Sequence, residues 1–139
     1  MMGTGPFAVP AFQWLLGSTH DVLALVTRPA PPTRRRSQPP VSPVREVAVQ
    51  QGLPVLMPPD VNATEFHANL QTLSPDLLVV CDFGQILSRE SLGIAPLGGI
   101  NLHGSLLPQY RGAAPVNYAI WNGDRETGVT AIHMTPRLD

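Results

Sequence analysis

The stretch that decides the fold is Asp76-Leu77-Leu78-Val79-Val80-Cys81, a short apolar run whose β-branched residues favour an extended backbone. Similar runs occupy residues 21–27, 99–102 and 129–134. Helical patterns lie between and before them, at residues 9–16, 43–51, 63–73 and 115–121. Alternating strands and helices predict an α/β fold, a Rossmann-like, mostly parallel sheet with helices on both faces. In such sheets the ligand binds at the carboxyl ends of the strands.

Composition limits the classes of function that need to be considered. The chain has 139 residues and 43% hydrophobic content, enough for the core of one domain. Its net charge of -1 gives no general attraction to nucleic acid or to an anionic membrane. The single cysteine excludes an internal disulfide, and no apolar run approaches the length of a membrane span. We therefore expect a soluble, cytoplasmic protein that does not associate with membranes.

The most informative candidate site is Asn101 with His103, at the end of a predicted strand. Residues two apart on an extended segment project from the same side, so an amide and an imidazole meet at the edge where ligands bind. An amide can donate to a carbonyl oxygen that becomes negative, and a histidine can donate a second hydrogen bond or move a proton. The pair suits acyl transfer, although a histidine in this position can also be purely structural.

Other residues invite weaker interpretations. The Gly3-Thr4-Gly5 turn could cradle a phosphate, but no acidic residue ends the next strand, so a structural turn is the better prediction. Cys81 with His103 as base is disfavoured because Cys81 ends an apolar strand beside Asp82. The remaining histidines lack metal-ligand spacing, so no metal is expected. Trp14 and Trp121 lie in helical segments and are predicted to be core residues.

Several motifs together carry a family resemblance. Asn101-Leu102-His103-Gly104-Ser105-Leu106-Leu107-Pro108, followed by residues 110–115, 121–124 and 126–130, closely resembles the methionyl-tRNA formyltransferases, a family that uses 10-formyltetrahydrofolate. The resemblance extends upstream through residues 3–8, 40–44, 52–55 and 75–80, and so covers nearly the whole chain. It implies the formyltransferase fold and transfer of a formyl group to the amino group of initiator methionyl-tRNA.

The resemblance also implies site residues. The family's catalytic trio matches Asn101, which would hold the formyl oxygen, His103, which would stabilise the oxyanion as an imidazolium, and Asp139, which would keep that imidazolium charged. The folate pocket of the family matches two segments, Ser105, Leu106, Leu107 and Pro108 in one and Phe83, Gly84, Gln85, Ile86 and Leu87 in the other.

A proline-rich segment contains Arg34, Arg35 and Arg36. On composition alone, a phosphate contact and a solvated loop are equally good interpretations. The family has a basic loop at this place that approaches the tRNA acceptor end, and this favours tRNA contact. The resemblance further implies that residues 1–139 are an incomplete N-terminal catalytic domain, truncated at both ends, without the family's C-terminal OB-like tRNA-binding domain. We expect such a fragment to be monomeric and weakly active or inactive.

Rival functions remain open. Within the class, the acceptor could be an amino sugar nucleotide or glycinamide ribonucleotide, or a related folate hydrolase could use water instead of an amine. From another class, the chain could be a non-catalytic folate- or dinucleotide-binding module. An intact Asn, His and Asp trio argues for catalysis, and the missing acidic residue after the second strand argues against a dinucleotide.

Overall fold

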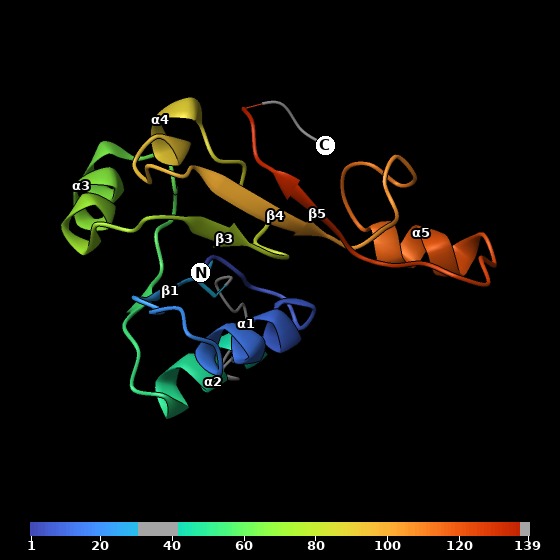
Figure 1. The fold of residues 1–139 in the computed structure, drawn as a ribbon, viewed down its shortest axis with the longest axis horizontal. Coiled ribbons are helices and arrows are strands. Elements are labelled where there is room, and N and C mark those ends of the chain that lie inside the picture. Colours follow the sequence, from blue (N-terminus) through green and yellow to red (C-terminus); the bar gives the residue numbers. More distant parts are fainter. Residues whose placement is uncertain (31–41, 137–139) are drawn as a thin grey trace, which may run out of the picture.

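The computed structural model describes residues 1–30 and 42–136 and has an α/β fold (Figure 1). The elements follow one another as α1 (Ala8–Leu16), β1 (Leu25–Val26), α2 (Pro43–Gln50), β2 (Val55–Leu56), α3 (Thr64–Leu73), β3 (Leu78–Val80), α4 (Arg89–Leu92), β4 (Gly99–His103), α5 (Pro115–Trp121) and β5 (Thr130–His133). Helix and strand alternate along most of the chain, as the sequence predicts.

The strands form one mixed sheet whose two halves are joined by a single residue. β1 pairs with β2 and β3 pairs with β4, in both cases parallel, whereas β5 runs antiparallel to β4. Met2 forms parallel bridges to both Val26 and Val80, so it lies between β1 and β3. The resulting order is β2-β1-Met2-β3-β4-β5, and β4 lies between a parallel and an antiparallel neighbour.

Each face of the sheet has its own hydrophobic core. Leu25 packs with α1 and α2, whereas Val26, the next residue of β1, packs with α3 and α4 on the other side. Adjacent strand residues point to opposite faces, so this division follows from the backbone. The predicted arrangement with helices on both faces is confirmed, and Figure 1 shows α1 and α2 together, away from α3 and α4.

The predicted helices are confirmed to within one residue at each end, and proline or glycine marks the limits of α1, α2 and α5, whereas α3 ends at the left-handed Ser74. Pro43 and Pro115 begin α2 and α5, where a missing N–H has no cost. Gly17 caps α1, and Gly52 and Gly123 follow α2 and α5 in the left-handed conformation. The sequence analysis did not predict β2 or α4, which are too short to show a periodic pattern.

The prediction that both tryptophans are core residues was wrong. Trp14 is 68% exposed and Trp121 is 83% exposed. Each lies two positions after a buried residue of its helix, Phe12 in α1 and Ala119 in α5. Two residues turn an α-helix by about 200°, which directs the tryptophan to the opposite side.

Across residues 1–30 and 42–136, none of the helices has the length and apolar character that a membrane span requires.

Candidate functional site

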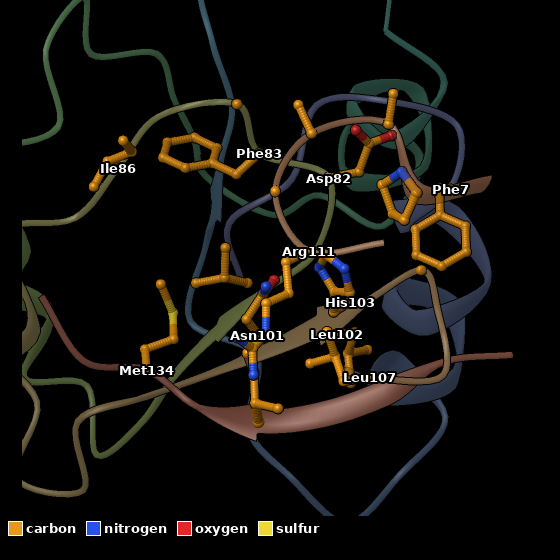
Figure 2. A pocket seen from close by; sticks show the side chains of 18 of the residues that line it. Phe7, Asp82, Phe83, Ile86, Asn101, Leu102, His103, Leu107, Arg111 and Met134 are labelled. Atoms are coloured by element: carbon orange, nitrogen blue, oxygen red, sulfur yellow. The ribbon is translucent and has the colours of Figure 1, made fainter. Parts of the chain in front are cut away.

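Asn101 and His103 lie together on one face of β4, at its carboxyl end, as the sequence predicts. Asn101 pairs with Val80 of β3 on one side and with Ile132 of β5 on the other, so the pair projects from the middle of the sheet. Leu102, between them, packs against the opposite core. Figure 2 shows both polar side chains inside a cavity, and His103 is almost completely buried.

The cavity has a volume of about 1100 Å³, large enough for a substrate of the size of a folate. Its walls are the turn before α1, the loop after β3, the last residues of β4, the segment between β4 and α5 with the first turn of α5, and the end of β5. Phe7, Phe83 and Leu107 supply apolar surface, and Arg111 adds a positive charge at the same cavity. Polar groups on a mostly apolar lining suit a flat heterocycle with one reacting end.

Most of the predicted folate residues line this cavity. Phe83, Gly84, Gln85, Ile86 and Leu87 form one wall, and Leu107 and Pro108 belong to another. Ser105 and Leu106 are not among the lining residues. The buried Ser105 hydroxyl donates to the Gln109 carbonyl at 2.6 Å, and the Ser105 carbonyl accepts from the Thr130 hydroxyl at 2.7 Å. Ser105 therefore shapes the segment that carries Leu107 and Pro108.

Side-chain hydrogen bonds hold the wall formed by residues 83–87. The Gln85 amide accepts from the Val61 N–H at 2.8 Å and donates to the Pro58 carbonyl at 3.2 Å. Asn62 donates to the Ile86 carbonyl at 2.9 Å. These bonds tie the wall to the segment between β2 and α3, so the backbone that faces the cavity is fixed before a ligand binds.

Gly84, in this wall, has a φ of 78°, in the left-handed region. A Cβ atom at Gly84 would lie 2.9 Å from the Cζ of Arg28. The Arg28 guanidinium therefore packs directly against the glycine backbone, and a side chain here would be strained and crowded.

The turn at Gly3-Thr4-Gly5 is structural, because its amides already donate within the fold, that of Gly3 to the Val26 carbonyl at 2.9 Å. The amides of Thr4 and Gly5 both donate to the Asp82 carbonyl, at 3.0 and 3.2 Å. The Asp82 carboxylate accepts from the Phe7 amide, yet burial raises the pKa of Asp82 more than this bond and the charge of Arg28 lower it. A carboxylate at this helix start takes the place that a phosphate would need, which argues against the dinucleotide interpretation.

Cys81 does not have the environment of a nucleophile. It is 1% exposed in the core beneath α1 and α2. Burial, with a smaller effect of the Asp82 charge, raises the pKa of Cys81 to about 11. A thiol of this kind is protonated at neutral pH. The prediction that Cys81 is buried is confirmed.

Two groups of predicted residues, Asp139 and Arg34 to Arg36, lie outside the described residues. The positions that flank the arginine segment are nevertheless informative. The Arg28 N–H donates to the Thr4 hydroxyl at 3.2 Å, and the Ser42 hydroxyl donates to the Thr4 carbonyl at 2.6 Å. Arg28 and Ser42 thus both lie beside Thr4, close to the cavity wall formed by Pro6 and Phe7.

One contact of the site was not foreseen from the sequence. His103 Nε2 lies 2.8 Å from the carbonyl oxygen of Tyr110, seven residues later. The only available signal was that Tyr110 belongs to the recognisable motif at residues 110–115.

In the part of the chain that the structure describes, no group of three or more His, Cys, Asp or Glu side chains could hold a metal ion.

Comparison with solved structures supports the fold. Phosphoribosylglycinamide formyltransferase from Bacillus halodurans matches 99% of this chain and 72% of its own, with a TM-score of 0.73 and 21% identity. The enzyme of the same name from Anaplasma phagocytophilum matches 99% and 64%, with a TM-score of 0.75 and 19% identity. At these identities the likeness establishes the formyltransferase fold and nothing finer.

Sequence comparison is more specific. Methionyl-tRNA formyltransferase of Rhodopirellula baltica is 59% identical over 143 residues, which covers 100% of this chain and 43% of the relative. The enzyme of Moorella thermoacetica is 48% identical over 138 residues, covering 99% and 44%. The chain thus spans less than half of the length of these relatives. The pattern of the family described as formyl transferase matches residues 1–139, and the chain belongs to that family.

Proposed function

We propose that the protein containing this chain transfers the formyl group of 10-formyltetrahydrofolate to the amino group of initiator methionyl-tRNA. The observation that carries the proposal is the pair Asn101 and His103, which project from the middle of the sheet into a cavity of about 1100 Å³. The identity of 59% to a methionyl-tRNA formyltransferase supports this acceptor. A cytoplasmic location, where translation begins, follows from the same proposal.

The reaction needs a polarised carbonyl and a path for one proton. The amine nitrogen attacks the formyl carbon, the bond from that carbon to N10 of the folate breaks, N10 gains a proton and the amine loses one. In this scheme the Asn101 amide donates to the formyl oxygen as negative charge develops on it. His103, as an imidazolium, stabilises the same oxygen and takes part in the proton transfer. Asp139 keeps the imidazolium charged.

The donor has a suitable cavity wall. Residues 83–87 present a backbone that Gln85 and Asn62 hold rigid, and Phe83 and Leu107 contribute apolar surface on two sides. A flat pterin fits such a slot, where it would stack on apolar groups and bond to main-chain amides and carbonyls. In this proposal Ser105 and Leu106 contribute to donor binding indirectly, by shaping the segment next to them.

The acceptor would be recognised in part by Arg34, Arg35 and Arg36. Arg28 and Ser42, which flank this part of the sequence, both contact Thr4 near the cavity, and this supports a contact of the arginines with the phosphates of an acceptor stem. Guanidinium groups bind phosphates in bidentate fashion.

The test is a formyl-transfer assay with the longest natural polypeptide that contains this sequence. Labelled 10-formyltetrahydrofolate is offered with charged initiator tRNA, with glycinamide ribonucleotide or with an amino sugar nucleotide. We expect transfer to the tRNA, and a loss of about 100-fold or more in His103→Ala and in Asn101→Ala, since each removes a group that stabilises the transition state. His20→Ala, an exposed histidine after α1, is the matched control. Transfer to another acceptor would reject the substrate assignment, and no transfer to any of them would reject the reaction.

A further inference from the structure

The cavity wall at residues 83–87 belongs to the loop between β3 and α4. The loop begins with Asp82 at a φ of 49° and Gly84 at a φ of 78°, both in the left-handed region. Among the residues that the structure describes, none accepts a hydrogen bond from the main-chain N–H groups of residues 85–87. Main-chain bonds therefore do little to fix this wall, and its shape depends on side chains from other elements.

Asn62, in the segment before α3, closes the far end of the wall. Its Nδ2 donates to the Ile86 carbonyl at 2.9 Å, and its Oδ1 accepts from the Ser88 N–H at 2.8 Å. A carbonyl only accepts and an N–H only donates, so these two main-chain groups determine the orientation of the amide between them. One side chain thus spans two main-chain positions of the loop and fixes its course.

A buried serine and a histidine hold Asn62 in turn. The hydroxyl of Ser91, in α4, donates to Asn62 Oδ1 at 2.7 Å and lies 2.8 Å from Nε2 of His67, in α3. Ser91 is 1% exposed, so its partners are protein groups and not bulk water. The Ser88 hydroxyl accepts from the Ser91 N–H at 3.1 Å and caps α4. This network joins α3, α4 and the wall, although its side chains do not line the cavity.

We propose that three positioning residues, Asn62, Ser91 and His67, form a clamp on the wall at residues 83–87 and thereby set the affinity for the formyl donor. The clamp holds the wall in the conformation that accepts the heterocycle of the donor, so binding does not have to order the loop. The clamp itself is a set of contacts within the fold, whereas its meaning for the donor rests on the function proposed above.

The clamp acts on donor binding and not on the reacting groups. Asn101 and His103 project from β4, and the hydrogen bonds of the clamp do not reach that strand. Loss of the clamp lowers the fraction of the protein that has the competent wall, and the apparent dissociation constant rises by the same factor. Once the donor is bound, its own contacts hold the wall, so kcat is expected to change little.

The first measurement is calorimetric titration of tetrahydrofolate, the product that lacks the formyl group, into the longest natural polypeptide that contains this sequence. Asn62→Ala removes three side-chain hydrogen bonds. It should raise the dissociation constant about tenfold or more, and Ser91→Ala and His67→Ala should each raise it about threefold. His67→Gln keeps a polar group at the place of Nε2 and should restore most of the affinity. Asn69→Ala, at an exposed asparagine of α3, is the matched control.

The second measurement is steady-state formyl transfer by the same variants. KM for the donor should rise by the same factors as the dissociation constant, while kcat stays within about twofold of the wild type. This division separates a loss of donor binding from a disturbance of the groups that react.

The third measurement is hydrogen exchange without any ligand. The Ser88 N–H donates to Asn62, so it should exchange about tenfold faster in Asn62→Ala. The Leu25 N–H donates to the Pro54 carbonyl in another part of the sheet and should keep its wild-type rate. A rate that rises at Ser88 alone indicates a loosened wall, whereas equal increases at both indicate a destabilised fold.

The outcomes separate the two proposals. The positioning role is rejected if Asn62→Ala and Ser91→Ala both bind tetrahydrofolate within about twofold of the wild type, or if the exchange rates of Ser88 and Leu25 rise equally. If Asn62→Ala does not fold, Ser91→Ala tests the same clamp through the loss of one hydroxyl. A wild type that binds tetrahydrofolate more tightly than the variants but formylates no acceptor would retain the clamp and reject the proposed function. A wild type that does not bind tetrahydrofolate would reject both.

Discussion

Replacing Gly5 with alanine tests how the start of α1 is built. The added Cβ would overlap the Asp82 carboxyl group, with its Cγ atom only 2.5 Å away. That carboxyl group accepts from the Phe7 N–H, and the Asp82 carbonyl accepts from Thr4 and Gly5. In Gly5→Ala the carboxylate has to leave its place, while the main-chain bonds can remain.

The size of the effect follows from two opposing contributions. A hydrogen bond to a charged group contributes about 1.5–3 kcal/mol, and its loss destabilises the fold. The freed carboxylate regains water, and burial is the largest influence on its pKa, so part of the loss is recovered. Crowding of this kind costs about 1–3 kcal/mol, and we expect Gly5→Ala to lower the free energy of unfolding by about 2 kcal/mol. For a domain of this size, that corresponds to a fall of about 8 °C in Tm.

The assay is equilibrium urea unfolding followed by circular dichroism, supported by thermal melts. Gly17→Ala is the control, because its Cβ would meet nothing closer than 3.7 Å. Asp82→Gly removes the obstructing side chain at a position whose φ of 49° glycine adopts easily. The double variant Gly5→Ala with Asp82→Gly should be within about 0.5 kcal/mol of Asp82→Gly alone. Equal stability of Gly5→Ala and wild type, or additive losses in the double variant, would refute the reasoning.

Three further predictions concern charge and reactivity. Since burial raises the pKa of Cys81 from 9.0 to about 11, a thiol reagent at pH 8 should label it about 100-fold more slowly in the native protein than in urea; equal rates would contradict this. Because the pKa of Asp82 is raised above 3.8, the folded state binds the extra proton, and stability relative to Asp82→Asn should fall as pH rises through the range just above 3.8. Urea unfolding at several pH values tests the sign. Replacing Arg34, Arg35 and Arg36 with alanine should raise KM for tRNA and reduce the slope of log KM against log salt by about 2–3, whereas an unchanged slope would exclude phosphate contact.

The local signals in the sequence were sufficient for most of the fold. Helices α2 and α5 begin at Pro43 and Pro115, where the sequence analysis predicts them, because the chemistry of helix ends depends on nearby residues. The direction of β5 could not be predicted from local signals. Residues 129–134 show that a strand is present, but pairing to β4 in the antiparallel sense depends on where the preceding helix delivers the chain.

Local signals in the sequence also predicted part of the site, but not the contacts that depend on the tertiary fold. Asn101 and His103 are two residues apart on a strand, so their common direction follows from the backbone period. The contact of His103 with Tyr110 depends on a left-handed φ, which favours glycine, and Tyr110 gives no hint of it. The capping by Asp82 joins residues more than seventy positions apart, and no local pattern contains that information.

The bridging position of Met2 has a consequence for the order of folding. This residue joins the two halves of the sheet, and its partner Val80 is 78 positions later in the chain, the difference between 80 and 2. Pairing over such a separation closes a long loop and is slow compared with local contacts. On the ribosome, Met2 must therefore wait until β3 has been synthesised before it can join the two halves of the sheet. Until then the apolar Met1 and Met2 lack β3 as a neighbour. A nascent chain that ends before β3 is therefore the species that a chaperone would protect most.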